Sequence, residues 1–418
     1  MNHSKLPCAI ANVVRLPNGL TVIHQEMATP AVVVDVWVKA GAKVEPAEWS
    51  GMAHFLEHMV FKGTQRLQPG EFDWAIESQG GMTNAATSHD YAHFFITVAA
   101  DTLPQTLPYL AELLLHAAIP ADEFVRERQV VLEEILQAQD DPDWLGYQAL
   151  CAQLYGEHAY GRAVLGTPEV LLDRSPEEMR QFHRAHYQPE QMTVAIAGGI
   201  DQTRAVELVQ QSFTQFAEPL WCPQTAEQAL PPQTFQHQTL HLPNLEQSRL
   251  TMAWSGPGVS QMETASGLDL LSTLLGGGQT ARLVRELREE RQLVQEIESS
   301  FSLQQGCSLL SLSMWLEAAQ ISEVETIVGD RIAELAEQPI TPAELSRCQR
   351  LLLNDYAFSM ETPGQIAGLY GYYATIAQPQ LATSYPQQVR SLTPAFLQQI
   401  ASQYLSPERY SAVVLQPE

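Results

Sequence analysis

Three residues in the first quarter of the chain have the types and spacing of a metal site. His54, Glu57 and His58 stand in the order H-x-x-E-H within residues 51–64, GMAHFLEHMVFKGT. Residues four apart on an α-helix lie on one face, so both imidazoles can bind one ion, and Glu57 can reach a water on it. The order inverts the H-E-x-x-H zinc motif. A catalytic zinc usually takes three protein ligands and a water, so one ligand is still missing.

A carboxylate-rich segment further along the chain is the candidate source of that ligand. Residues 127–137 read ERQVVLEEILQ, and their apolar positions are compatible with a helix. Glu127 and Glu134 are seven residues apart and would share one helix face. The helix around the motif must therefore pack beside a second helix that presents carboxylates to it.

Several phrases around these residues resemble one family. Beside HFLEHMVFKGT, they are GGMTNAATSHDYAHFF at 80–95, AYGRAVLGT at 159–167 and FHRAHYQPE at 182–190. The chain resembles the pitrilysin family of zinc peptidases, in the branch that includes mitochondrial processing peptidase. The resemblance covers most of the N-terminal half and is weaker in the C-terminal half.

The resemblance implies a role for each site residue. The family's third ligand lies 76 residues after the second histidine, which is Glu134 here, with neighbouring Glu133 as the alternative. A further family glutamate, seven residues earlier, falls on Glu127; it either orients a histidine or holds water, or is an ordinary solvated glutamate. Asn84 matches an asparagine that hydrogen-bonds the substrate backbone; ordinary turn chemistry after Gly80-Gly81 is the alternative. Glu57 would be the general base that takes a proton from the zinc-activated water.

The C-terminal half departs from the family pattern at one informative position. Residues 281–296, ARLVRELREERQLVQE, resemble a family helix in which an arginine and a tyrosine seven residues later hold a substrate carbonyl. Arg288 fits the arginine, but Gln295 stands where the tyrosine belongs; a charged surface helix is the alternative reading of Arg288. In two-chain members of the family, one subunit binds zinc and the other carries this arginine-tyrosine pair. We therefore expect a homodimer, or a heterodimer with a paralogous chain that supplies the Arg/Tyr pair.

The two halves of the chain look like copies of one unit. Residues 175–191 align with 393–409 at an offset of 218, and a second register at an offset of 216 places the motif residues on Leu270, Thr273 and Leu274. The second copy then keeps the helix and lacks the metal ligands. We expect an α/β fold of two homologous domains, each a mostly antiparallel β-sheet flanked by helices, as the resemblance also implies.

Length and composition agree with two domains. A chain of 418 residues exceeds what one core usually supports, and a Pro- and Gln-rich stretch at 219–238 is the predicted linker between domains 1–218 and 239–418. The net charge of −25 argues against nucleic acid as a partner. It favours solubility or, by steering, basic peptide substrates.

Cysteine usage and the N-terminus bear on location. The five cysteines are scattered without metal-ligand spacing, and their odd number argues against a disulfide framework. The first residues lack a secretory or transit pattern, and no apolar run is long enough to span a membrane. We expect a cytoplasmic protein with reduced thiols, including Cys8.

These patterns lead to one functional hypothesis and one alternative. The hypothesis is a zinc metalloendopeptidase that cleaves peptides or unfolded segments inside a clam-shell chamber, with Glu57 as base and His54, His58 and Glu134 as ligands. The alternative is a non-catalytic peptide-binding or assembly subunit, because some members of the family have lost the motif. The intact H-x-x-E-H order argues against that alternative.

Overall fold

The computed structural model describes residues 11–223, 225, 228–243 and 245–418, so Cys8 lies outside the described part. The chain divides into two compact units whose segments alternate along the sequence. The first unit comprises Met1–Leu136, Arg162–Glu227 and Ala357–Thr383, and the second comprises Gln137–Gly161, Gln228–Tyr356 and Ser384–Glu418. Residues 137–161 therefore belong to the unit that the C-terminal half mainly forms, and residues 357–383 belong to the unit that the N-terminal half mainly forms.

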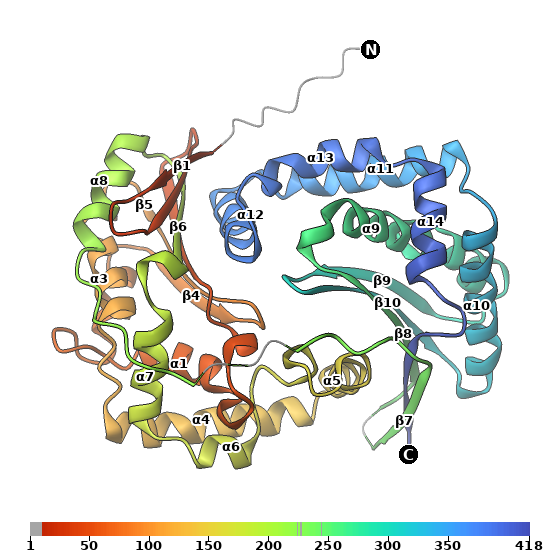
Figure 1. The fold of residues 1–418 in the computed structure, drawn as a ribbon, viewed down its shortest axis with the longest axis horizontal. Coiled ribbons are helices and arrows are strands. Elements are labelled where there is room, and N and C mark those ends of the chain that lie inside the picture. The colour runs from red at the N-terminus through yellow and green to blue at the C-terminus, as the bar shows by residue number, and fades with distance from the viewer. Residues whose placement is uncertain (1–10, 224, 226–227, 244) are drawn as a thin grey trace. The chain divides into compact units, whose positions relative to one another are not determined.

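The first unit is a six-stranded sheet with helices on it (Figure 1). Its strands are β1 Asn12–Arg15, β2 Thr21–Glu26, β3 Ala31–Val38, β4 Met82–Thr87, β5 Ala92–Ala99 and β6 Met192–Gly198. Its helices are α1 Met52–Val60, α2 Glu71–Glu77, α3 Leu103–Leu115, α4 Ala121–Gln139, α6 Pro168–Leu172, α7 Pro176–His186, α8 Gln202–Ser212 and α12 Pro363–Ile376. Short 3-10 turns are η1 Ala42–Val44, η2 Ala47–Trp49 and η4 Pro189–Gln191. The last turn of α4 extends past the boundary of the unit.

Strand order places β4 at one edge of this sheet. The order is β1-β2-β6-β3-β5-β4; β2 and β6 run parallel, and every other neighbouring pair is antiparallel. The central strand β3 is buried along nearly its whole length. Helix α12 contacts β3 and β6, and a Cβ on Gly371 would lie 2.1 Å from Trp37 Nε1, so this close approach requires glycine.

The second unit is a five-stranded sheet, again with helices. Its strands are β7 Gln236–Leu242, β8 Ser248–Pro257, β9 Glu296–Leu303, β10 Cys307–Leu316 and β11 Ser411–Pro417. Its helices are α5 Pro142–Tyr155, α9 Met262–Gly276, α10 Ile321–Glu337, α11 Pro342–Phe358, α13 Leu381–Ser391 and α14 Pro394–Tyr404. A π-helical stretch covers Val284–Glu290, and 3-10 turns cover Ala159–Gly161, Val259–Gln261 and Ala318–Gln320. Helices α11 and α13 each cross a boundary between the units near one end.

The two sheets have the same topology. The order β7-β11-β8-β10-β9 repeats β2-β6-β3-β5-β4, including one parallel pair, β7 with β11. Helix α9 packs on its sheet through Leu270 and Leu274, both fully buried, at the positions that the internal alignment assigned to the two histidines. The predicted class, two related α/β domains with mostly antiparallel sheets, is confirmed.

Several elements of the first unit follow from short-range sequence chemistry. The Asn18-Gly19 pair forms the β1–β2 hairpin turn, with Gly19 at φ 98°. The apolar, β-branched-rich segments at 31–39, 91–99 and 192–197 contain β3, β5 and β6. In the part of the chain that the structure describes, no helix is both long enough and apolar enough to span a bilayer.

Candidate metal centre

Helix α1 carries the H-x-x-E-H motif on its one polar face. Its apolar side chains, Phe55, Leu56 and Met59 among them, are fully buried in the core of the first unit. Gly51 begins the helix at φ 91°, where a Cβ would lie 2.7 Å from the Leu165 carbonyl oxygen. This packing fixes the helix against its surroundings and aims the remaining face at α4.

A buried carboxylate caps the N-terminus of α1. Glu45 is fully buried, and its two oxygens accept hydrogen bonds from the backbone N–H groups of Gly51, at 3.0 Å, and Ala53, at 2.6 Å. Burial raises the pKa of Glu45 to about 8, although both bonds and nearby Arg162 oppose that shift. Arg162 also donates to the Glu45 carbonyl oxygen at 2.9 Å. The cap satisfies donors that every helix N-terminus leaves unpaired, one residue before His54.

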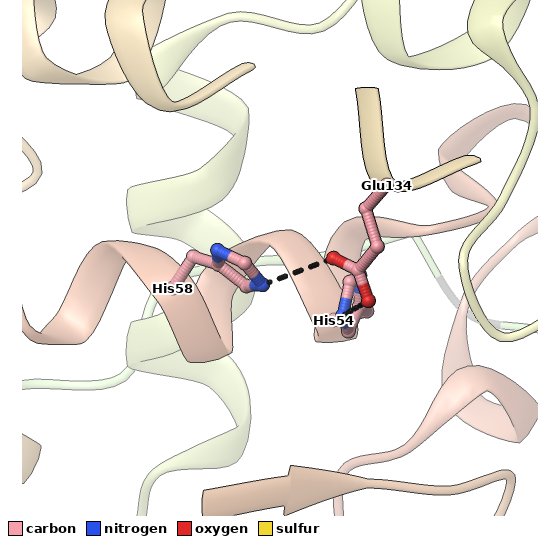
Figure 2. A group of neighbouring side chains, drawn as sticks. All are labelled: His54, His58 and Glu134. Atoms are coloured by element: carbon pink, nitrogen blue, oxygen red, sulfur yellow. Dashed lines mark ion pairs between the residues drawn. The ribbon is translucent and has the colours of Figure 1, made fainter. Parts of the chain in front are cut away.

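Helix α4 brings the third residue of the centre. Glu134 Oε1 lies 3.5 Å from His54 Nε2, and Glu134 Oε2 lies 3.4 Å from His58 Nε2. Figure 2 shows the carboxylate directed toward both imidazoles. Glu133, the alternative, is exposed and outside this group. The three ligand atoms lie within 4.8 Å of one another, and among the described residues this is the one cluster with metal-site geometry.

The donor set fits zinc. Two imidazole nitrogens and a carboxylate oxygen are the ligand types of a catalytic zinc site, which keeps its fourth position for water. Two ligand atoms each about 2.1 Å from a tetrahedral ion stand roughly 3.4 Å apart. The 3.4 and 3.5 Å separations between the carboxylate oxygens and the Nε2 atoms have this size. The residues can therefore hold zinc with little rearrangement.

The protonation of the three residues reflects burial and mutual contact. Burial lowers the pKa of His54 to about 4, so its imidazole is neutral at physiological pH. Burial also disfavours charge on His58, but hydrogen bonds with Glu134 and Glu127 outweigh it and raise the pKa of His58. The His58 contact lowers the pKa of Glu134. A neutral imidazole and an ionised carboxylate are the forms that bind metal.

Glu127 connects the centre to a lysine. Its Oε1 lies 3.0 Å from His58 Nδ1, and its Oε2 lies 2.7 Å from Lys62 Nζ. A carboxylate on the far nitrogen of a ligand histidine fixes the tautomer that leaves Nε2 free for the metal. Lys62 was missed at the sequence level; its position four residues after His58, near the same helix face, is the signal that was available.

Glu57 contacts Thr87, a residue outside the sequence motif. The Thr87 hydroxyl, at the end of β4, donates to Glu57 Oε2 at 2.6 Å. Burial raises the pKa of Glu57, while the Thr87 bond opposes the shift. The other oxygen, Oε1, accepts no hydrogen bond within the described residues and is available to a water. A partly buried carboxylate of raised pKa, held by one oxygen, suits a general base.

A pocket of about 290 Å³ adjoins Glu57 and His58. Asn84, on the edge strand β4, lines it together with Thr83 and Ala85. Within the protein, Asn84 Oδ1 accepts from the backbone N–H of Ala85 at 2.9 Å. Asn84 therefore lies on the edge strand and lines the pocket beside Glu57.

Arg288 belongs to the second unit, in the π-helical stretch. Its guanidinium is paired with Glu289, at 2.8 Å between Nη2 and Oε1. Gln295 is exposed, and Gln292 holds a left-handed φ of 55° between them. Arg288 and the residues of the candidate metal centre thus belong to different units of the chain.

Comparison with known proteins agrees with this geometry. Residues 20–168 match the family model described as Insulinase (Peptidase family M16), and residues 174–352 match Peptidase M16 inactive domain. A protein of Mycobacterium leprae named as an uncharacterized zinc protease is 31% identical and covers 96% of this chain and 91% of its own length. The chain belongs to the M16 family. In this family member, the two histidines of the H-x-x-E-H motif and Glu134 form a cluster that could hold a metal ion.

Other M16 relatives extend along the whole chain. The zinc protease PqqE of Helicobacter pylori is 27% identical and covers 97% of this chain and 92% of its own length. A crystal structure of a protease from Helicobacter pylori, 27% identical, superposes with a TM-score of 0.87 over 97% of this chain. Pitrilysin, 17% identical, shares the fold at a TM-score of 0.82; it matches 98% of this chain and 45% of its own.

Proposed function

We propose that this M16 protein is a zinc-dependent endopeptidase whose ion is held by His54, His58 and Glu134. The convergence of these three side chains from α1 and α4 is the observation that carries the proposal. Zinc in such a site polarises the scissile carbonyl and makes a water acidic enough to be a nucleophile near neutral pH. The remaining chemistry belongs to side chains of the chain itself.

Glu57 moves the proton. Its Oε1 takes a proton from the attacking water, while the Thr87 hydroxyl holds Oε2 and the orientation of the carboxylate. The same carboxyl group then delivers the proton to the amine nitrogen that leaves. Glu127, tied to Lys62, keeps His58 oriented through this cycle.

The peptide binds along β4. This strand is at the edge of its sheet, so its outer backbone groups can pair with an extended chain, the mode in which peptides add a strand to a sheet. Asn84 stands on that strand beside the pocket at Glu57 and can hold the substrate backbone. Pairing through backbone groups suits peptides and unfolded segments and excludes folded domains.

The working enzyme is a dimer, either of identical chains or with a paralogue. Pitrilysin has the fold of this chain in only 45% of its length, so two such chains equal one pitrilysin chain in size. A partner could also supply the Arg/Tyr pair that Arg288 and Gln295 leave incomplete. Light scattering of the purified chain, alone and with a co-purifying partner, tests this assembly; a fully active monomer contradicts it.

The decisive experiment compares bound metal and cleavage. The wild type should bind about one zinc per chain and cleave unstructured peptides, whereas Glu57→Gln should bind zinc equally and lose more than about a hundredfold in kcat. Zinc bound without cleavage, alone or with any partner chain, favours the alternative of a peptide-binding subunit. Absence of bound zinc rejects both the centre and the reaction.

Location and substrate charge are further parts of the proposal. Four described cysteines are buried thiols that form no disulfide bond, which suits a reducing compartment such as the cytoplasm; they are Cys151, Cys222, Cys307 and Cys348. The net charge of −25 steers basic peptides toward the enzyme. Cleavage rates that are indifferent to peptide charge and to salt contradict the steering.

A further inference from the structure

We propose that the pocket beside Glu57 is a subsite for a basic side chain next to the scissile bond, and that Asp73 selects it. The inference rests on the proposed peptidase function and adds the residue that decides which side chain is accepted. Glu57 and His58 line the pocket of about 290 Å³, so a side chain in it belongs to a residue close to the bond that is cut.

The walls of the pocket are part apolar and part charged. Phe61 supplies an aromatic surface, and Ala85 and Thr83 come from the edge strand. Asp73, from the first turn of α2, supplies a carboxylate. Lysine and arginine combine an apolar stem with a cationic tip, and they bury the stem while the tip keeps a polar partner.

The charges around the pocket leave Asp73 uncompensated. Lys62 also lines the pocket, but its ammonium lies 2.7 Å from Glu127, so this pair is neutral. A divalent ion held by the metal centre would balance the charges of Glu57 and Glu134. Within the described residues, no cation and no hydrogen-bond donor is paired with the half-buried Asp73 carboxylate. A cationic substrate tip would supply the missing partner.

Asp73 also has an ordinary structural explanation, because a carboxylate in the first turn stabilises a helix N-terminus. Glu77, at the other end of α2, is exposed and does not line the pocket, so Glu77→Gln changes the net charge of the same helix equally. It is the matched control for long-range charge effects, and only Asp73 faces the pocket.

The test uses peptides that differ in one side chain. Zinc-loaded enzyme is given two series of peptides that share one cleavage site. One series varies the residue before the scissile bond and the other varies the residue after it. In each series that residue is lysine, its uncharged isostere norleucine, or glutamate. In one series the wild type should prefer lysine to norleucine in kcat/KM by about fivefold, the size expected of a partly exposed ion pair. Asp73→Asn should remove the preference, Asp73→Lys should turn it toward glutamate, and Glu77→Gln should keep it.

Binding gives a second measurement that does not depend on turnover. Fluorescence anisotropy of the same peptides on zinc-loaded Glu57→Gln, with and without Asp73→Asn, should show the same loss of lysine preference. A preference that survives Asp73→Asn, or that Glu77→Gln removes equally, overturns the subsite and leaves the peptidase standing. Failure of the wild type to bind and cleave any peptide of the series overturns the proposed function and this inference together.

Discussion

The Thr87 hydroxyl donates a 2.6 Å hydrogen bond to Oε2 of Glu57, joining the end of an edge strand to the base on helix α1. The contact leaves Glu57 one oxygen for a proton and restricts the rotation of its carboxylate. It also links the strand that would hold a peptide to the group that would act on it. The orientation of the Glu57 carboxylate thus depends on a residue outside the sequence motif.

Replacing Thr87 by Val should lower kcat by about tenfold with little change in KM, because the substitution keeps the shape and removes the hydrogen bond that orients the base. Steady-state kinetics on a saturable peptide measures both parameters. Thr87→Ser retains the hydroxyl and is the control. Equal losses in the two variants would show that packing, and not the hydrogen bond, matters.

Glu127→Gln should weaken zinc binding by about ten- to a hundredfold, since the amide neither neutralises Lys62 nor holds His58 as a carboxylate does. Competition with a chelator gives the affinity without any need for activity. Glu133→Gln changes an exposed glutamate on the same helix and should bind zinc like the wild type. Unchanged affinity in Glu127→Gln would remove Glu127 from the centre.

Glu45→Ala should destabilise the first unit by about 1–3 kcal/mol, because it removes both oxygens that accept from the backbone N–H groups of Gly51 and Ala53 and leaves these donors unpaired. Urea unfolding of the metal-free protein measures the loss. Glu48→Gln, an exposed change in the adjacent 3-10 turn, is its control. A midpoint equal to that of the wild type would mean that the cap contributes nothing.

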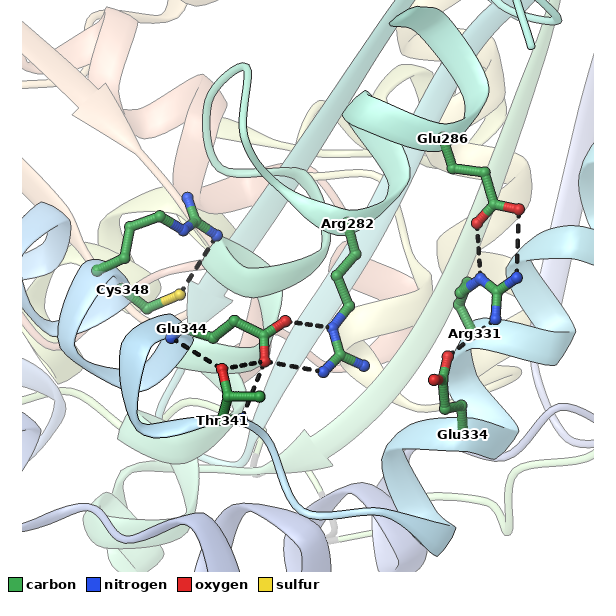
Figure 3. Close-up of polar contacts among 8 residues, drawn as sticks. Arg282, Glu286, Arg331, Glu334, Thr341, Glu344 and Cys348 are labelled. Carbon is green, nitrogen blue, oxygen red and sulfur yellow. Dashed lines mark hydrogen bonds and ion pairs between the residues drawn. The ribbon is translucent and has the colours of Figure 1, made fainter. Parts of the chain in front are cut away.

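An ion-pair network in the second unit predicts acid sensitivity (Figure 3). Arg282 donates to both oxygens of Glu344, at 2.8 and 3.1 Å, and Thr341 adds two further hydrogen bonds, so the pKa of Glu344 falls to about 2. A folded-state pKa below the unfolded value of 4.5 gives stability that is present above pH 4.5 and is lost as the pH falls toward 2.

Glu344→Gln should therefore cost about 1 kcal/mol at pH 7 and less at pH 3, a small figure because solvent screens this partly exposed pair. Urea unfolding at the two pH values, followed by a probe in the second unit, gives the difference. Glu337→Gln, at an exposed position on α10, should shift neither value appreciably. A cost that does not depend on pH would reject Glu344 as the titrating group.

The sequence was sufficient for the parts of the site that local periodicity and a known spacing determine. His54, Glu57 and His58 follow from one helical turn, and Glu134 follows from the family distance to the second histidine. Thr87 was missed because its partner Glu57 lies 30 residues away. Glu45 was missed because its partners Gly51 and Ala53 lie 6 and 8 residues away across turns, where no regular period applies. Such contacts depend on tertiary packing.

Helices α5 and α12 both depend on context that their local sequence does not specify. Asp141-Pro142 is typical of a helix end, and α4 ends two residues before it. Asp141 also caps α5 by accepting from the Asp143 N–H at 3.0 Å, with Pro142 in the first turn. Helix α12 was not predicted, since Gly364, Gly368 and Gly371 lower its intrinsic propensity. Its packing on β3 and β6 overrides that preference.

The alternation of segments between the two units affects how the chain would behave when cut. A single proteolytic nick within 219–238 would produce two fragments, and each would retain a piece that completes the other's unit, 137–161 in one direction and 357–383 in the other. The nicked protein should therefore elute as one species in native chromatography and separate only in denaturant. Halves expressed separately would each lack part of a core, and would need one another to become soluble.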